Sequence, residues 1–308
     1  MMTNSPSGKR KVILSEPRLN QAASGSLSED VDEEDAFSPL RIAAAQGNPK
    51  IVTSLLAQGA DPNEPPKGWY GKNALQAAAL EGHLEIIDAL LSAGAVVDAP
   101  GGNNGGRTAL TLAAGQGHEE VIDRLINAGA DVYHPPHRYM GLTPLQAACE
   151  GGHERVVRKL IALGADVNAP AAFTSGYTAL QAASEYGHAA IVKLLLEHGA
   201  DVNAPMSRNK GRAALQAAAE FGDVAVIDIL LEAGADVNAA ACRAFGTTAL
   251  CAAAEQGHLD AVKRLLRAGA RLDVRSTNRS WTAVQAAKTY GHIEVVSVLL
   301  DAQAGKSV

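Results

Sequence analysis

The feature that most constrains the fold of this 308-residue chain is a motif that recurs about every 35 residues. One leucine position returns seven times, and valine takes its place in the last copy: Leu40, Leu75, Leu110, Leu145, Leu180, Leu215, Leu250 and Val284. A glycine recurs in step, from Gly47 to Gly291. A fixed period of this length is typical of repeat architectures, in which each unit contacts only its neighbours. We count eight repeats, over residues 37–303.

Each repeat has the pattern of two short helices. In the second repeat, Asn73 suits an N-cap, an alanine-rich segment follows, and Gly82 suits the left-handed residue after a helix. Segment 83–93 then carries an apolar stripe at helical spacing. The cap position is threonine in five other repeats: Thr108, Thr143, Thr178, Thr248 and Thr282. Because a single pair cannot bury its own stripe, we predict an all-α solenoid of eight stacked helix-turn-helix repeats with extended loop tips.

The composition excludes several classes of protein. The formal net charge is -6, so a general nucleic-acid or anionic-membrane surface is not expected. The sequence contains no run of about 18 apolar residues, which is the length needed to cross a bilayer. Three cysteines form no disulfide framework and fit a reducing compartment. We therefore expect a soluble protein of the cytoplasm and/or nucleus that contacts neither membrane nor nucleic acid directly.

The chain ends differ from the repeats. Residues 1–36 lack periodicity and combine the basic cluster Lys9-Arg10-Lys11 with an acidic run at 29–35, so we expect a disordered tail. Three basic residues are fewer than the usual five to eight of an import signal. We expect the array at 37–303 and a short tail at 304–308. The last repeat has few charges on its second helix, so either a partner covers that face or the array is poorly capped.

The repeat resembles a known family. Thr143-Pro144-Leu145-Gln146-Ala147-Ala148, Gly152-His153 and Gly164-Ala165-Asp166-Val167-Asn168 are similar to the ankyrin repeat. The resemblance covers nearly nine-tenths of the chain. Two departures are a unit of 35 rather than 33 residues, and glutamine where the family usually has histidine after the leucine. The lengthened loop with Thr-Ala-Leu-Gln-Ala-Ala is similar to arrays common in filamentous fungi. The resemblance implies a non-enzymatic protein that binds other proteins through a concave face.

No catalytic or metal-binding arrangement emerges from the motifs. His118-Glu119 and His153-Glu154 begin like a zinc-protease helix, but Ile122 and Val157 stand where the second histidine ligand is required. We expect these histidines to bond to backbone between repeats. His134 and His137 have no neighbouring carboxylate or cysteine. We therefore expect that the protein is not an enzyme and that it binds no cofactor or metal. Cys149 and Cys251 fall inside first helices, whereas Cys242 lies in a loop, where we expect exposure.

The positions that the repeat leaves free are loop tips, the residue before each N-cap and the two residues before Gly-His. Eleven of the twelve aromatic residues lie there: Trp69, Tyr70, Tyr133, Tyr139, Phe173, Tyr177, Tyr186, Phe221, Phe245, Trp281 and Tyr290. Glu150, Glu185, Glu220 and Glu255 recur at the 35-residue spacing and should form a line. We therefore predict a partner-binding surface of Glu150, Tyr177, Glu185, Tyr186, Arg212, Glu220, Phe221, Phe245, Glu255, Trp281 and Tyr290. The glutamates could equally be helix formers at a solvated site, with the rings packing loops.

These residues fit a peptide partner with basic and apolar side chains. The principal interpretation is a monomeric interaction scaffold or adaptor. A nuclear transcriptional coregulator is an alternative, to which the cluster Lys9–Lys11 gives slight support. A second alternative is the recognition array of a larger signalling or immune-type protein, which the poorly capped end favours and the initial methionine and tail oppose.

Overall fold

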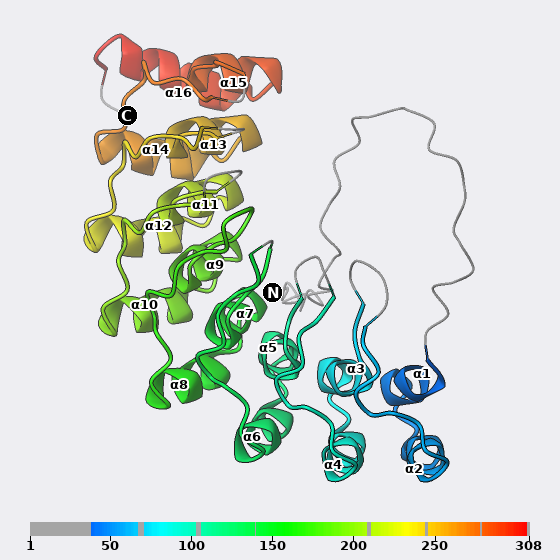
Figure 1. The fold of residues 1–308 in the computed structure, drawn as a ribbon. Helices are drawn as coiled ribbons and strands as arrows, with labels where there is room; N and C mark the ends of the chain where they lie inside the picture. The colour runs from blue at the N-terminus through cyan, green and yellow to red at the C-terminus, as the bar shows by residue number, and fades with distance from the viewer. Residues whose placement is uncertain are drawn as a thin grey trace, which may run out of the picture. The chain divides into compact units, whose positions relative to one another are not determined.

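The chain divides into two units, residues 1–36 and 37–308. The computed structural model describes residues 38–66, 71–102, 106–138, 140–207, 211–243, 246–277 and 279–306. The expected disordered tail and its cluster Lys9–Lys11 lie outside the described residues. The described part of the second unit forms sixteen short helices arranged in eight pairs (Figure 1). This confirms the predicted all-α solenoid.

The helix bounds follow the repeat. The first helices of the eight repeats are α1 (Pro39–Ala45), α3 (Ala74–Glu81), α5 (Ala109–Gln116), α7 (Pro144–Gly151), α9 (Ala179–Glu185), α11 (Ala214–Phe221), α13 (Ala249–Gln256) and α15 (Ala283–Thr289). The second helices are α2 (Pro49–Ala57), α4 (Leu84–Ser92), α6 (Glu119–Asn127), α8 (Glu154–Ala162), α10 (Ala189–Glu197), α12 (Val224–Glu232), α14 (Leu259–Arg267) and α16 (Ile293–Gln303).

The helices of this unit form two layers. Each first helix contacts the first helices of the adjacent repeats, and most second helices contact the adjacent second helices. Within the array, the layer of first helices lies on the inner side of the bend, and the layer of second helices lies on the outer side (Figure 1). Side chains at one repeat position therefore line up along a layer.

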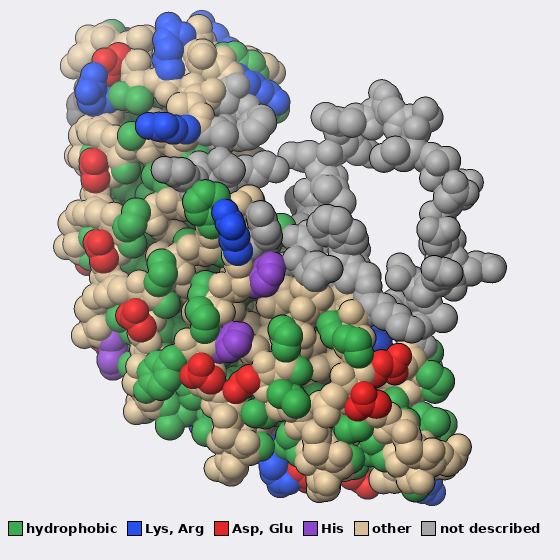
Figure 2. All heavy atoms as spheres, viewed as in Figure 1, with side chains coloured by type: hydrophobic (Ala, Val, Ile, Leu, Met, Phe, Trp, Pro, Cys, Tyr) green, Lys and Arg blue, Asp and Glu red, His purple; other side chains and the backbone are tan. Residues whose placement is uncertain are grey.

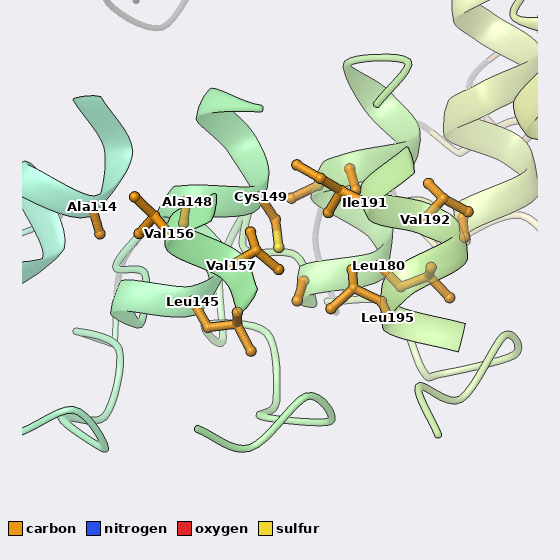
Figure 3. Packing of buried hydrophobic residues seen from close by; sticks show 14 of the residues in the cluster. Ala114, Leu145, Ala148, Cys149, Val156, Val157, Leu180, Ile191, Val192 and Leu195 are labelled. Atoms are coloured by element: carbon orange, nitrogen blue, oxygen red, sulfur yellow. The ribbon is translucent and has the colours of Figure 1, made fainter. Parts of the chain in front are cut away.

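The core is a continuous seam between the layers. Ala148 and Cys149 of α7 are fully buried, as are Val157 and Leu160 of α8. Figure 3 shows Cys149 beside Val157, with Leu180 and Leu195 of the next repeat close to each other. Small alanine side chains let neighbouring first helices approach closely, and each buried leucine contributes about 1.5–3 kcal/mol. The apolar stripe of each repeat is thus shared with its neighbours.

The expected N-caps are present. The threonine hydroxyls of the capping positions accept hydrogen bonds from the backbone N–H three residues on, as the Asn73 side chain does for Gln76. The sixth repeat is the exception, because Ala213 has no side-chain oxygen and α11 begins without this bond. Gln216 still accepts a hydrogen bond from the Ala213 N–H at 3.1 Å.

The Gly-His histidines bond to backbone between repeats, as predicted. In six of them Nε2 lies 3.0–3.3 Å from a carbonyl oxygen of the preceding repeat: His83, His118, His153, His188, His258 and His292. Their rings lie against the glycine that ends the preceding first helix. In the sixth repeat Asp223 occupies this position and instead caps α12 by accepting from the Val226 N–H.

The loops are also tied between repeats. Asn203 donates to the Gly234 carbonyl and accepts from the Asp236 N–H, and Asn63, Asn168 and Asn238 repeat this pattern. Tyr133 occupies the equivalent position in the third repeat, and its hydroxyl donates to the Leu163 carbonyl at 3.0 Å. Its ring is exposed, but its hydroxyl is part of the scaffold.

One sequence expectation is wrong. Cys242 is buried rather than exposed, with 7% of its surface accessible. The reason is the adjacent loop: the Thr277 hydroxyl donates to the carbonyl of Cys242 at 2.7 Å, and the Thr277 N–H donates to the Gly246 carbonyl. All three cysteines are therefore buried. Burial also raises the pKa of the Cys149 thiol.

Candidate interaction surface

The residues of the predicted surface lie along the inner layer, at the ends of first helices and just before their N-caps. Glu150, Glu185, Glu220 and Glu255 occupy the last turns of α7, α9, α11 and α13. Tyr186, Phe221 and Tyr290 share one register position, directly before the glycine that ends the first helix. Tyr177, Arg212 and Trp281 share another, directly before the N-cap. The stacking of repeats brings these two positions together.

Arginine side chains pair with the glutamate line. Arg107 Nη2 lies 3.2 Å from Glu150 Oε2, across one repeat boundary. Arg212 binds Glu220, with Nε 2.5 Å from Oε2, and reaches Glu185 at 3.6 Å. These three glutamates are thus largely compensated, so the surface is a mixed-charge network rather than a row of free carboxylates.

Tyrosine completes the network. Tyr177 lies near the Glu150 carboxylate, and its half-buried ring packs against the core. At the other end, the Tyr290 hydroxyl donates to Glu255 Oε1 at 3.1 Å. Each of these carboxylates therefore lies near a phenol of the following repeat, and the hydrogen bond to Glu255 fixes the position of the Tyr290 ring.

Burial controls the charge state of this surface. Burial raises the pKa of Tyr186 to about 12, and burial together with the nearby Glu150 carboxylate raises the pKa of Tyr177 well above its usual value. Burial also raises the pKa of Glu185, although Arg212 acts in the opposite direction. Both phenols therefore stay protonated and remain hydrogen-bond donors at neutral pH.

Three rings of the surface are accessible to a partner. The exposed fractions are 57% for Phe221, 44% for Tyr290 and 36% for Tyr186. Tyr177 and Trp281 are half-buried. Phe245 lies outside the described residues, as do Trp69, Tyr70 and Tyr139. Exposed tyrosine and phenylalanine side chains on a rigid layer are typical anchors of protein interfaces.

Two arginines of the surface were not predicted from the sequence. Arg107 directly precedes the N-cap Thr108 and therefore occupies the same position as Tyr177 and Trp281. Its position in the repeat was therefore a signal from which Arg107 could have been predicted. Arg279 lies in the loop before Trp281, and its guanidinium carbon is 4.7 Å from the Trp281 ring centroid. No periodicity marks its position, because the last interval is one residue shorter than the others.

Within the described ranges, no group of three or more His, Cys, Asp or Glu side chains is arranged to hold a metal ion. Among the same residues, no helix combines the length and apolar character that a bilayer span requires.

The stacked helix pairs and the side-chain surface along one layer define a helical-repeat protein. A family model described as ankyrin repeats in three copies matches residues 21–101, 40–135, 98–171, 124–206, 171–241 and 239–308. The chain belongs to the ankyrin-repeat family, as the repeat motifs predicted.

Solved structures agree with this assignment. The crystal structure of the human ASB11 ankyrin repeat domain is 29% identical to this chain. The match covers 76% of this chain and 99% of that domain, with a TM-score of 0.61. The comparison with curated proteins found no match. Ankyrin repeats form a non-catalytic fold typical of protein–protein interaction.

Proposed function

We propose that this protein is a non-enzymatic scaffold or adaptor that binds a protein partner through the inner layer of repeats four to seven. The observation that carries the proposal is the pair of exposed rings Tyr186 and Phe221, which share one register position of the inner layer and follow Glu185 and Glu220. Each truncated ring of this kind in an interface typically costs 1–2 kcal/mol or more of binding free energy.

The partner segment carries basic and apolar side chains. Apolar groups would cover the exposed rings, and a basic side chain would compete with Arg212 for Glu185 and Glu220. Residues 38–257 contain 22 acidic and 15 basic residues, so long-range attraction also favours a basic segment.

Affinity purification from native extract, read by mass spectrometry, tests the proposal. Tyr186→Ala with Phe221→Ala should lose partners that the unaltered chain captures. The matched control, Val96→Ala with Leu163→Ala, truncates exposed apolar side chains that follow second helices and should keep them. Identical captures by all three proteins would place recognition elsewhere on the chain.

A second pair of variants tests the charge of the partner. Glu185→Lys with Glu220→Lys should abolish capture of a basic segment by repulsion. Glu197→Lys with Glu232→Lys makes the same charge change in the same two repeats, at exposed ends of the second helices, and should leave capture intact. Equal losses from both pairs would show that net charge, rather than the inner layer, controls binding.

The identity of captured partners distinguishes the roles. Cytoplasmic signalling or structural proteins support the scaffold, whereas transcription factors and tail-dependent nuclear location support a coregulator. We propose that the chain is monomeric and works in the cytoplasm and/or nucleus. Its likeness to fungal-type arrays and its origin from a larger signalling or immune-type protein stay predictions.

A further inference from the structure

The charge of the array reverses near its C-terminal end. Residues 258–308 contain eight basic and four acidic residues, in contrast to the acidic excess of residues 38–257. Figure 2 shows lysine and arginine side chains gathered over the end of the array that carries α14–α16. A segment that fits the acidic repeats would therefore be repelled here, so this end calls for a partner of opposite chemistry.

Arg279 is held by two aromatic rings at this end. Its guanidinium carbon lies 4.7 Å from the Trp281 ring centroid and 5.9 Å from the Tyr290 ring centroid. Arg279 Nη1 also donates to the Tyr290 hydroxyl at 2.7 Å, and that hydroxyl donates on to Glu255. Stacking uses the face of the guanidinium, so the N–H donors on its edge that Tyr290 does not occupy stay available for a ligand.

The two ends of the loop that presents Arg279 are hydrogen-bonded to each other. The Ser276 N–H donates to the Trp281 carbonyl at 2.9 Å, and the Trp281 N–H donates to Ser276 Oγ at 3.3 Å. Arg275 Nη1 donates to the Ser280 carbonyl at 2.8 Å, which places a second exposed guanidinium on the same loop. Ser280 has a left-handed backbone with φ 54°. A closed loop loses little conformational entropy when a ligand binds, so the two arginines are preorganised.

These arginines differ from most others in the array. Arg107, Arg124, Arg158, Arg212, Arg264 and Arg271 all form ion pairs with glutamate or aspartate. Among the described residues, no carboxylate forms an ion pair with Arg275 or Arg279. Lys288, exposed on the last turn of α15, adds a third cation without such a pair.

We propose that the Arg275–Arg279 surface, built on Trp281 and Tyr290, binds an acidic segment of a protein partner. A glutamate or aspartate carboxylate accepts hydrogen bonds from the edge of the Arg279 guanidinium, and Arg275 binds a neighbouring carboxylate. Charge-assisted bonds of this kind are the strong ones, and a stacked guanidinium offers them in fixed geometry. The site is separate from the surface around Tyr186 and Phe221, so it does not depend on the partner proposed there.

Fluorescence anisotropy with a defined probe tests this site. A fluorescein-labelled octaglutamate peptide is titrated with the full chain at about 50 mM salt, where charge attraction is weakly screened, and octaglutamine serves as the uncharged probe. We expect binding of octaglutamate alone. Arg279→Gln should weaken it about tenfold, as expected for loss of a charge-assisted contact.

Two further variants separate a built site from general attraction. Trp281→Leu keeps every charge but removes the stacking surface, and should weaken binding several-fold. Arg155→Gln removes one charge from the exposed outer face of α8 and should change nothing. Urea unfolding of each variant confirms that the array is intact.

Equal affinities for the unaltered chain and Arg279→Gln would overturn the proposal, as would no binding of octaglutamate up to about 1 mM. A dimer in sedimentation that Arg279→Gln disrupts, without octaglutamate binding, would assign the site to a second copy and also overturn it. None of these results alters the capture experiment with Tyr186 and Phe221, so the two proposals fail independently.

Discussion

At the scale of single residues, the Gly-His pair joins one repeat to the next. Gly152 ends α7 with φ 75°, a left-handed conformation that glycine adopts at little cost. It also leaves room for the next histidine: a Cβ at this position would lie 2.5 Å from His188 Cε1. His188 in turn bonds to the Glu150 carbonyl at 3.2 Å. One glycine therefore serves both the turn and the contact between repeats.

The sixth repeat provides a matched comparison for this glycine. Gly187 has nearly the same φ, 73°, but faces the carboxylate oxygen of Asp223, which can rotate away. Both Gly152→Ala and Gly187→Ala should cost about 1–2 kcal/mol for the left-handed backbone. Gly152→Ala should cost about 1 kcal/mol more, because it displaces His188 from its hydrogen bond. Urea unfolding measures the difference, and equal costs would contradict this role of the histidine.

The half-buried histidines at the junctions between repeats predict a pH dependence of stability. Burial lowers the pKa of His153 and His188 below the ordinary 6.5. Between the lowered pKa of each histidine in the folded chain and its ordinary pKa in the unfolded chain, the unfolded chain binds more protons. The free energy of unfolding must therefore fall as the pH falls through about 6.5. The free energy of unfolding should be lower at about pH 5.5 than at about pH 7.5.

The control for that measurement is His153→Gln with His188→Gln. This variant should be less stable at neutral pH and should show a shallower loss on acidification. Glu185, whose raised pKa acts in the opposite direction, is present in both proteins and cancels in the comparison. Identical pH profiles would show that these histidines do not contribute.

At the scale of helices, the sixth repeat lacks two hydrogen bonds that most repeats have. Ala213 gives α11 no side-chain cap, and Asp223 replaces the histidine that would bond to the fifth repeat. Arg212 spans the junction between the fifth and sixth repeats and binds both Glu185 and Glu220. The ion pairs offset part of the loss, at the location where we place partner binding.

Restoring the cap should stabilise this helix. Ala213→Thr supplies the hydroxyl that Thr178 and Thr248 already provide, and should raise the free energy of unfolding by about 1 kcal/mol. Ala213→Val is the control, because valine has the shape of threonine without the oxygen. Urea unfolding that ranks the threonine variant no higher than the valine variant would contradict the assignment of Ala213 as an unfilled cap.

The helices could be predicted from the sequence because each is specified by signals within about ten residues. The N-cap threonines, the glycines and the apolar stripes are local signals, and the structure confirms them. Contacts between repeats carry no such signal. The choice of Arg212 between Glu185 and Glu220, and the covering of Cys242 by the Thr277 loop, depend on how side chains of adjacent repeats meet.

At the scale of the whole array, stacking converts a repeated position into a continuous surface. Phe221 follows Tyr186 by 35 residues, and Tyr290 follows Phe221 by 69 residues. They nevertheless lie along one layer, because equivalent helices stack on one another. The period was therefore enough to predict which residues share a face. The period was not enough to predict how exposed each side chain is. Tyr177 occupies a free position of the repeat but packs against the core.

The most direct test of the account is site-specific photo-crosslinking in native extract. A benzophenone analogue of phenylalanine is placed at Phe221 on the inner layer or, in a second protein, at Glu197 on the outer layer. We predict that only the Phe221 probe yields a crosslinked partner, and that Tyr186→Ala in the same chain reduces the yield. Crosslinks from Glu197 alone, or equal yields from both positions, would contradict the claim that the inner layer binds the partner.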